Sequence, residues 1–171
     1  MKKLFFLAIA LIGFITISSA QSFKFGIKGG VNFANIDAGS RFDPDARTGF
    51  HIGAVATLGL GDKFALQPEV LYSAQGSDDL KVDYINVPIL LKYKFLKFLS
   101  FEAGPQFGIA VNDDYEIGEP ESFDVSIAAG AGVKFGKFFG QLRYNYGFTD
   151  VDETIGSQNR TFQISVGYYI F

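Results

Sequence analysis

Hydrophobic and polar residues alternate along most of this chain with a period of two, rather than with the spacing of a helix. Each of eight segments sets aromatic or aliphatic side chains on one face against polar residues or glycine on the other. The segments lie at 23–33, 50–60, 64–74, 84–93, 101–111, 123–135, 138–148 and 161–170. The pattern therefore predicts eight β-strands.

The connections between these segments alternate between short and long. Segments two and three, four and five, and six and seven are joined by a few residues around Gly61, Leu96 and Gly136. The other four connections are longer and rich in aspartate, glutamate, glycine and serine. Short turns at one end and long loops at the other are typical of an outer-membrane barrel, whose short turns face the periplasm. We therefore predict an all-β fold, an eight-stranded antiparallel up-and-down transmembrane β-barrel.

The amino terminus has a different pattern. Two lysines precede an apolar run at residues 4–17, and Ser18 and Ala20 supply the small side chains of a cleavage site. The run is short for a helix that spans ~30 Å of hydrocarbon, and it suits a secretory signal. We predict a signal peptide at residues 1–20 and a mature barrel at 21–171, with an uncleaved membrane anchor as the alternative.

Alternation alone does not say which face of the barrel meets water. A soluble barrel would collect its apolar face inside, whereas a membrane barrel turns that face toward lipid. The interior of an eight-stranded barrel is just wide enough for side chains, and most of the 20 phenylalanines and 8 tyrosines share one face. We therefore predict that the aromatic face points outward, where aromatic girdles form at both membrane interfaces.

The inward face then carries charged side chains. They are Lys24, Lys28, Glu69, Lys92, Glu102, Asp124, Lys134 and Arg143. Buried charges need partners, so we predict a lumen ion-pair network that fills the barrel, with a selective ion path as the alternative. The predicted network consists of Lys28, Glu69, Lys92, Glu102 and Arg143.

The amino-acid composition limits the classes of function that the chain can have. The mature chain has 13 basic and 18 acidic residues, a net charge of −5 without a basic patch, which argues against nucleic-acid binding. It has no cysteine and one histidine, His51, which excludes disulfides and thiolate metal sites. We expect His51 at the rim of the barrel, as an ordinary polar residue or as part of a rim hydrolase. Because no serine, aspartate and histidine have a recognisable spacing, we predict no enzymatic activity, no cofactor and no resident metal.

The stretch at residues 112–122 is acidic. It contains no basic residue, and its carboxylates are Asp113, Asp114, Glu116, Glu119 and Glu121. Carboxylates suit Ca²⁺, but their spacing matches no defined calcium loop. We expect a solvated surface, with a weak cation-binding loop as the alternative.

Five stretches carry a family resemblance. They are FGIKGGVNFANI (25–36), LQPEVLYSAQG (66–76), YINVPILLKYKF (84–95), FEAGPQFGIA (101–110) and FQISVGYYIF (162–171). Together they resemble the outer-membrane β-barrel, or porin-family, proteins of Bacteroidetes-type Gram-negative bacteria, which are similar in architecture to OmpA and OmpX. The resemblance implies a place in the cell outer membrane, contact with outer-membrane lipid, and handling by the barrel-insertion machinery during biogenesis. It brings no catalytic residues.

Two features need explanation in such a barrel. Prolines, which remove a ladder donor, fall inside three successive strands at Pro68, Pro88 and Pro105. We expect them only to bend the sheet, with a bulge or weakened seam that shapes a side opening as the alternative. Phe171 departs from the family pattern, because it is in phase with inward-facing residues such as Gln163, whereas the apolar series ends at Ile170.

These observations predict a monomeric outer-membrane barrel with a structural or surface-interaction role. The alternatives are a small porin that passes ions or small solutes and a soluble, extracytoplasmic, lipocalin-like carrier.

Overall fold

The computed structural model describes residues 22–36, 47–77, 80–110, 123–147 and 159–171, and strands make up most of them. The strands are β1 (Phe23–Ile36), β2 (Arg47–Leu60), β3 (Phe64–Ser77), β4 (Leu80–Lys94), β5 (Leu99–Ala110), β6 (Phe123–Phe135), β7 (Phe138–Gly147) and β8 (Asn159–Tyr169). The predicted signal peptide and the acidic stretch at 112–122 lie outside the described residues.

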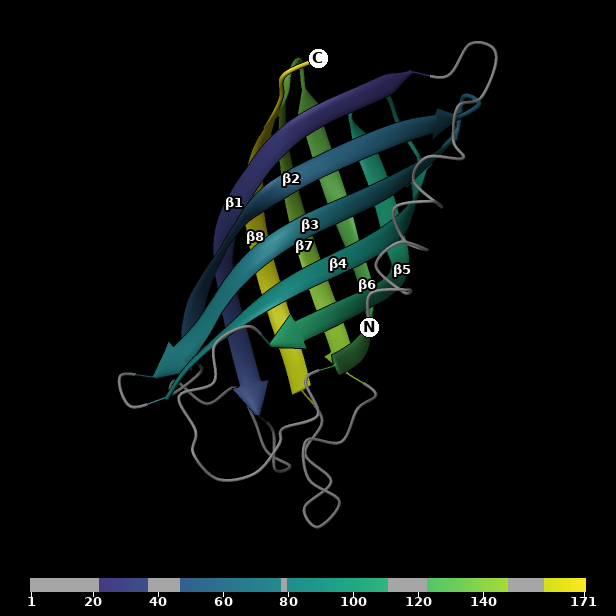
Figure 1. Cartoon of the computed structure of the whole chain (residues 1–171). Helices are drawn as coiled ribbons and strands as arrows, with labels where there is room; N and C mark the ends of the chain where they lie inside the picture. Colours follow the sequence, from purple (N-terminus) through teal and green to yellow (C-terminus); the bar gives the residue numbers. More distant parts are fainter. Residues whose placement is uncertain (1–21, 37–46, 78–79, 111–122, 148–158) are drawn as a thin grey trace, which may run out of the picture.

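The eight strands form one closed antiparallel barrel, in which each strand pairs with its sequence neighbours and β8 closes onto β1 (Figure 1). The predicted fold is therefore confirmed. Closure pairs both edges of the sheet, which hydrocarbon requires because it offers no water to unpaired backbone groups. Among the described residues, no helix is long and apolar enough to cross a membrane.

The C-terminus lies at the end of the barrel that carries the short turns, at the top of Figure 1. There the backbone N–H of Tyr169 donates to the carbonyl oxygen of Lys137, in the β6–β7 turn, at 2.8 Å. We call this the short-turn end, and the opposite end the loop end.

The aromatic and aliphatic face points outward, as predicted. Large apolar side chains are exposed along the outer wall, for example Ile52 at 59% and Val166 at 70%. The neighbouring inward positions hold buried polar side chains, among them His51 and Ser165. This is the reverse of a soluble carrier, which would expose its polar face.

A few apolar groups also fill the lumen. Val55, Leu71 and Leu90 are fully buried there, and the rings of Phe139 and Tyr169 pack with centroids 4.5 Å apart. The Phe139 ring lies over Gly167, where an added Cβ would meet the ring and would lie 2.7 Å from the carbonyl oxygen of Ile27. Glycine at this position leaves the space that the ring occupies.

Each of the three prolines interrupts one ladder without changing its register. Two bridges are missing beside Pro68 in the β2–β3 pairing, beside Pro88 in β3–β4, and beside Pro105 in β4–β5. The partner positions on the two sides of each gap still match, so the prolines form no bulge, and the weakened seam that would shape a side opening stays a prediction. The gaps lie in three adjacent pairings, as expected where prolines supply no N–H.

One connection predicted to be long is short. β3 runs to Ser77 and β4 begins at Leu80, so two residues, 78 and 79, separate them. The ladder continues through the pairs Gly76–Lys81 and Ser77–Leu80, beyond the segment in which apolar and polar residues alternate. Backbone hydrogen bonds do not require apolar side chains, so the alternation ended before the strands did.

The last residue of the chain breaks phase and joins the outer wall. Ile170 N–H donates to the Phe25 carbonyl oxygen, and Phe25 N–H donates to the Phe171 carbonyl oxygen, both at 2.8 Å. Ile170 and Phe171 thus both face Phe25, as in a β-bulge. The exposed Phe171 ring stacks on the Phe25 ring with centroids 5.8 Å apart.

Candidate functional site

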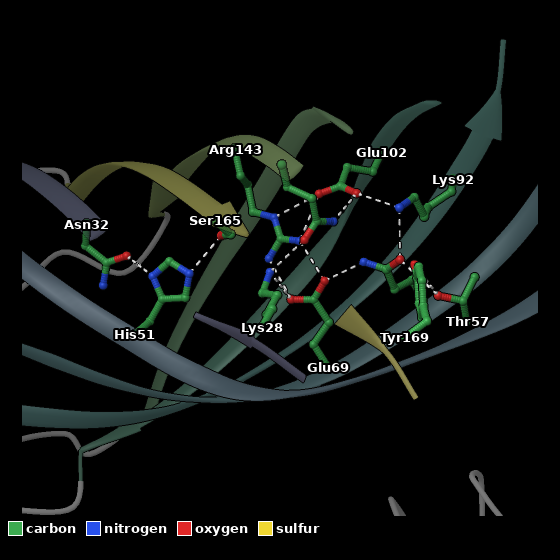
Figure 2. Close-up of polar contacts among 12 residues, drawn as sticks. Lys28, Asn32, His51, Thr57, Glu69, Lys92, Glu102, Arg143, Ser165 and Tyr169 are labelled. Atoms are coloured by element: carbon green, nitrogen blue, oxygen red, sulfur yellow. Dashed lines mark hydrogen bonds and ion pairs between the residues drawn. The ribbon is translucent and has the colours of Figure 1, made fainter. Parts of the chain in front are cut away.

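Five charged residues from five strands meet in the middle of the lumen. All are buried and all occupy inward positions, because the alternation of each strand turns them away from lipid. They are Lys28 of β1, Glu69 of β3, Lys92 of β4, Glu102 of β5 and Arg143 of β7, the residues that the sequence analysis grouped together (Figure 2).

Arg143 is the hub of this cluster. Its two terminal nitrogens donate to the two oxygens of Glu69, Nη1 to Oε2 at 2.9 Å and Nη2 to Oε1 at 2.7 Å. Its Nε and Nη2 also donate to Oε1 of Glu102, at 3.1 and 2.8 Å. The planar guanidinium makes this possible, because its donors form a rigid fork that matches carboxylate geometry.

The remaining donors complete both carboxylates. Lys28 Nζ lies 2.8 Å from Glu69 Oε2, and Lys92 Nζ lies 3.4 Å from Glu102 Oε2. Two amides add to them, since Gln67 donates to Glu69 Oε1 at 2.6 Å and Gln141 donates to Glu102 Oε2 at 2.7 Å. Each of the four carboxylate oxygens therefore has two cationic or hydrogen-bonding partners, which is what buried ionised groups require.

Neutral residues that the sequence analysis did not select tie this cluster together. Gln67 Oε1 accepts from Lys92 at 2.9 Å and from Thr57 at 3.1 Å, and Thr57 lies 3.2 Å from the hydroxyl of Tyr169. Gln141 Oε1 accepts from Lys28 at 3.1 Å. We call the five charged residues with Gln67, Gln141, Thr57 and Tyr169 the central network. The neutral members share the inward phase of the charged ones, which was the available sequence signal.

His51 lies inside the barrel, so the expectation of a rim position is wrong. Its side chain is buried, and its Nε2 lies 2.8 Å from Ser165 Oγ while its Nδ1 lies 2.7 Å from Asn32 Oδ1. Asn32 in turn donates to Ser73 Oγ at 2.7 Å. In Figure 2 this series of hydrogen bonds between uncharged side chains lies to one side of the central network, opposite Thr57 and Tyr169.

The order serine, histidine, asparagine has the distances of a nucleophile, a base and an orienting group. Sequence spacing could not show it, because the three residues come from β8, β2 and β1 and meet only when the barrel closes. Ser165, His51 and Asn32 are each at most 2% exposed. The three side chains satisfy one another as buried polar groups.

Toward the loop end most side chains of the lumen are uncharged, and fewer of their polar atoms are paired. A cavity of about 20 Å³, enough for a water molecule, is bordered mainly by amide and hydroxyl side chains. Four buried atoms that have no hydrogen-bond partner among the described residues cluster here, namely Gln106 Oε1, Gln163 Oε1, and both polar atoms of Asn145. Asp124 also borders this cavity and remains apart from the central network.

The structure offers no metal centre within the described part of the chain. No group of three or more histidine, cysteine, aspartate or glutamate side chains with suitable geometry occurs there. The acidic stretch with Asp113, Asp114, Glu116, Glu119 and Glu121 lies outside the described residues, so the weak cation-binding loop stays a prediction.

Comparison with known proteins supports the barrel assignment. A family model described as an outer membrane protein β-barrel domain matches residues 19–153. No curated protein matches by sequence.

Solved structures that are similar to the chain share its fold at low sequence identity. The attachment invasion locus protein Ail of Yersinia pestis is 14% identical, with a TM-score of 0.56 over 90% of this chain and 100% of Ail. Neisserial surface protein A is 12% identical, with a TM-score of 0.54 over 88% of this chain and 99% of that protein. A de novo designed transmembrane β-barrel is 11% identical, with a TM-score of 0.50 over 86% and 95%.

Proposed function

Because the chain belongs to the outer membrane protein β-barrel domain family, we propose that it is a sealed outer-membrane barrel with a structural or surface-interaction role. The observation that carries the proposal is the central network, in which Glu69, Glu102 and Arg143 are paired across the lumen. These side chains are buried and meet across the middle of the lumen, which supports a path closed to ions.

Conductance tests the seal against the porin alternative. The full chain, refolded and inserted into planar lipid bilayers, is expected to give no conductance steps. A matched pair of variants provides the control. Glu102→Ala removes one carboxylate of the central network and should produce measurable leakage, whereas Asp62→Ala, in the β2–β3 turn, should stay silent. Regular steps from the unsubstituted protein would reject a sealed lumen and favour the porin.

With its lumen closed, the barrel acts through the long connections at its loop end. Among similar structures, one shows Ail with the heparin analogue sucrose octasulfate. In the present chain the stretches at 111–122 and 148–158 contain eight acidic residues and no basic one, so they would repel a polyanion of this kind. We propose that the surface partner of this chain is cationic rather than a polyanion.

Because the sequence contains no cysteine, single introduced cysteines can test whether the acidic stretches face the cell exterior. In intact cells, a membrane-impermeant maleimide should label Gly118→Cys, in the acidic stretch, and should not label Lys63→Cys, in the β2–β3 turn. Permeabilised cells should show labelling of both. Labelling of Lys63→Cys alone in intact cells would mean that the barrel is oriented the other way and that the acidic loops do not face the exterior.

We further propose that the protein is not an enzyme. The support is the enclosure of Ser165, His51 and Asn32, which have the distances of a catalytic set but almost no exposed surface.

A further inference from the structure

Lysines gather at the short-turn end of the barrel. Lys63 and Lys137 lie in turns, whereas Lys24, Lys94 and Lys134 occupy inward positions near the ends of β1, β4 and β6. Asp62 is the one acidic side chain among the described residues at this end. The charge of this end is therefore opposite to that of the acidic loop end.

The inward lysines line a cavity of about 150 Å³. Its floor is the central network, because Thr57, Lys92, Gln141 and Tyr169 belong both to that network and to the cavity wall. Figure 2 shows Lys92, Thr57 and Tyr169 together at one end of the network. A cavity of this size holds a molecule of about six non-hydrogen atoms. We call it the lysine cavity.

Among the five lysines that line the lysine cavity, Lys92 is paired with Glu102, whereas the described residues give no ion pair to the other four, Lys24, Lys94, Lys97 and Lys134. Within the described part of the chain, the ion pairs involve Lys28, Lys92 and Arg143, and none involves Lys24, Lys94 or Lys134. Lys24 Nζ and Lys134 Nζ lie 5.8 and 6.0 Å from the centroid of the Tyr169 ring. Two ammonium groups beside one ring repel each other, and an anion between them would relieve that repulsion.

The direction of these side chains separates them from ordinary interfacial lysines. A lysine on the outer wall can extend to the lipid headgroups that surround a barrel. Lys24 and Lys134 instead share the inward phase of Lys28 and Ser126, and both border the lysine cavity. Their charge is therefore directed at something that enters the mouth of the barrel.

We propose that the lysine cavity binds a small anion that carries a phosphate group. Free phosphate has five non-hydrogen atoms and up to about two negative charges near neutral pH, and the phosphodiester of a lipid headgroup has one. Both forms suit the volume of the cavity and the lysines that make no ion pair. Lysine binds phosphate as a point charge, and among the described residues no arginine lines the cavity to hold a planar carboxylate in a bidentate manner. Free phosphate, a small phosphomonoester and a phospholipid headgroup all present this group. The inference concerns the end opposite the long loops and does not depend on any loop partner.

Calorimetric titration tests this proposal on the refolded full chain in an uncharged maltoside detergent. One arm uses inorganic phosphate and the other uses dihexanoyl phosphatidylglycerol below its micelle concentration. We expect saturable binding of one molecule per barrel, weakened by added NaCl because charge drives it. The double substitution Lys24→Gln and Lys134→Gln should weaken binding at least about tenfold.

A matched control removes the same charge from the same end. The control variant combines Lys63→Gln and Lys137→Gln, two residues outside the cavity wall. It should change the dissociation constant for phosphate or for the lipid less than twofold. The heat-induced shift in gel mobility checks that each variant is folded, and Lys94→Gln gives a second, single-site test of the cavity. Because the double cavity variant removes a repulsion, it should fold at least as well as the parent.

The two arms identify the source of the phosphate. Lysine-dependent binding of inorganic phosphate indicates a free ligand, and lysine-dependent binding of the lipid alone indicates a headgroup. Either result supports the proposal. Absence of saturable binding in both arms, or an equal loss of affinity in the control variant, would overturn it.

Discussion

A single side chain, Arg143, donates four hydrogen bonds to the two buried carboxylates of the lumen. Substitution Arg143→Met would leave Glu69 and Glu102 without their shared cation, and removal of one partner of a buried ion pair typically costs about 3–5 kcal/mol. We expect a loss of that size in the free energy of unfolding, measured by urea titration in detergent micelles. Lys63→Met, in an exposed turn, should change it by less than about 0.5 kcal/mol.

A rescue experiment separates charge from packing at Arg143. If uncompensated charge causes the loss, then adding Glu102→Gln and Lys92→Gln to Arg143→Met should recover a large part of the stability, because the remaining buried charges, Lys28 and Glu69, stay paired at 2.8 Å. A triple variant that is no more stable than the single one would show that the side chain stabilises the barrel mainly by filling space.

The central network and the hydrogen bonds around His51 differ in how far the sequence predicted them. The charged residues of the central network could be predicted because charges on an inward face must be paired. Glu69 and Arg143 were therefore predicted as members of one network from the sequence alone. His51 could not be joined to its partners. Its contacts with Asn32 and Ser165 span 19 and 114 residues along the chain, and phase shows that a side chain points inward without showing which neighbour it meets.

At the scale of the strand, close approach between β7 and β8 depends on one glycine. The Phe139 ring occupies the space of a Cβ at Gly167, so Gly167→Ala would overpack the lumen and should cost about 1–3 kcal/mol of unfolding free energy. At Gly140, on the outer face of β7, an added Cβ finds its nearest neighbour at 3.5 Å. Gly140→Ala should therefore be close to neutral in the same thermal or urea unfolding assay, and an equal loss in both variants would contradict this account.

Strand phase was predictable while strand ends were not. Membrane and lumen impose opposite chemistry on the two faces, so alternation through β2 identified Ile52 as outward and Val55 as inward. Beyond the membrane that contrast is not needed, and β3 and β4 continue to Ser77 and Leu80 on backbone hydrogen bonds alone. The bulge opposite Phe25 was also hidden, because alternation counts residues and does not report a local change in pairing.

At the scale of the whole molecule, the barrel is polarised along its axis. Among the described residues, lysines without an ion pair lie at the short-turn end, a paired network lies in the middle, and amides without a hydrogen-bond partner, such as Asn145, lie toward the loop end. The outer wall, by contrast, is apolar around the barrel. Side chains that face the lumen thus set how the two mouths differ, while side chains that face outward set how deeply the barrel lies in lipid.

The outer wall makes a depth-dependent prediction for the complete barrel in lipid. Leu142 lies mid-strand on β7, and Leu60 ends β2 at the short-turn end; they are 50% and 40% exposed. An arginine facing hydrocarbon costs about 2–4 kcal/mol at the midplane and about 0–1 kcal/mol near an interface. Leu142→Arg should therefore destabilise the barrel by several times more than Leu60→Arg, measured by reversible urea unfolding from phospholipid vesicles. Equal effects of the two substitutions would mean that the wall around Leu142 is not covered by hydrocarbon, because water solvates an arginine equally well at either height.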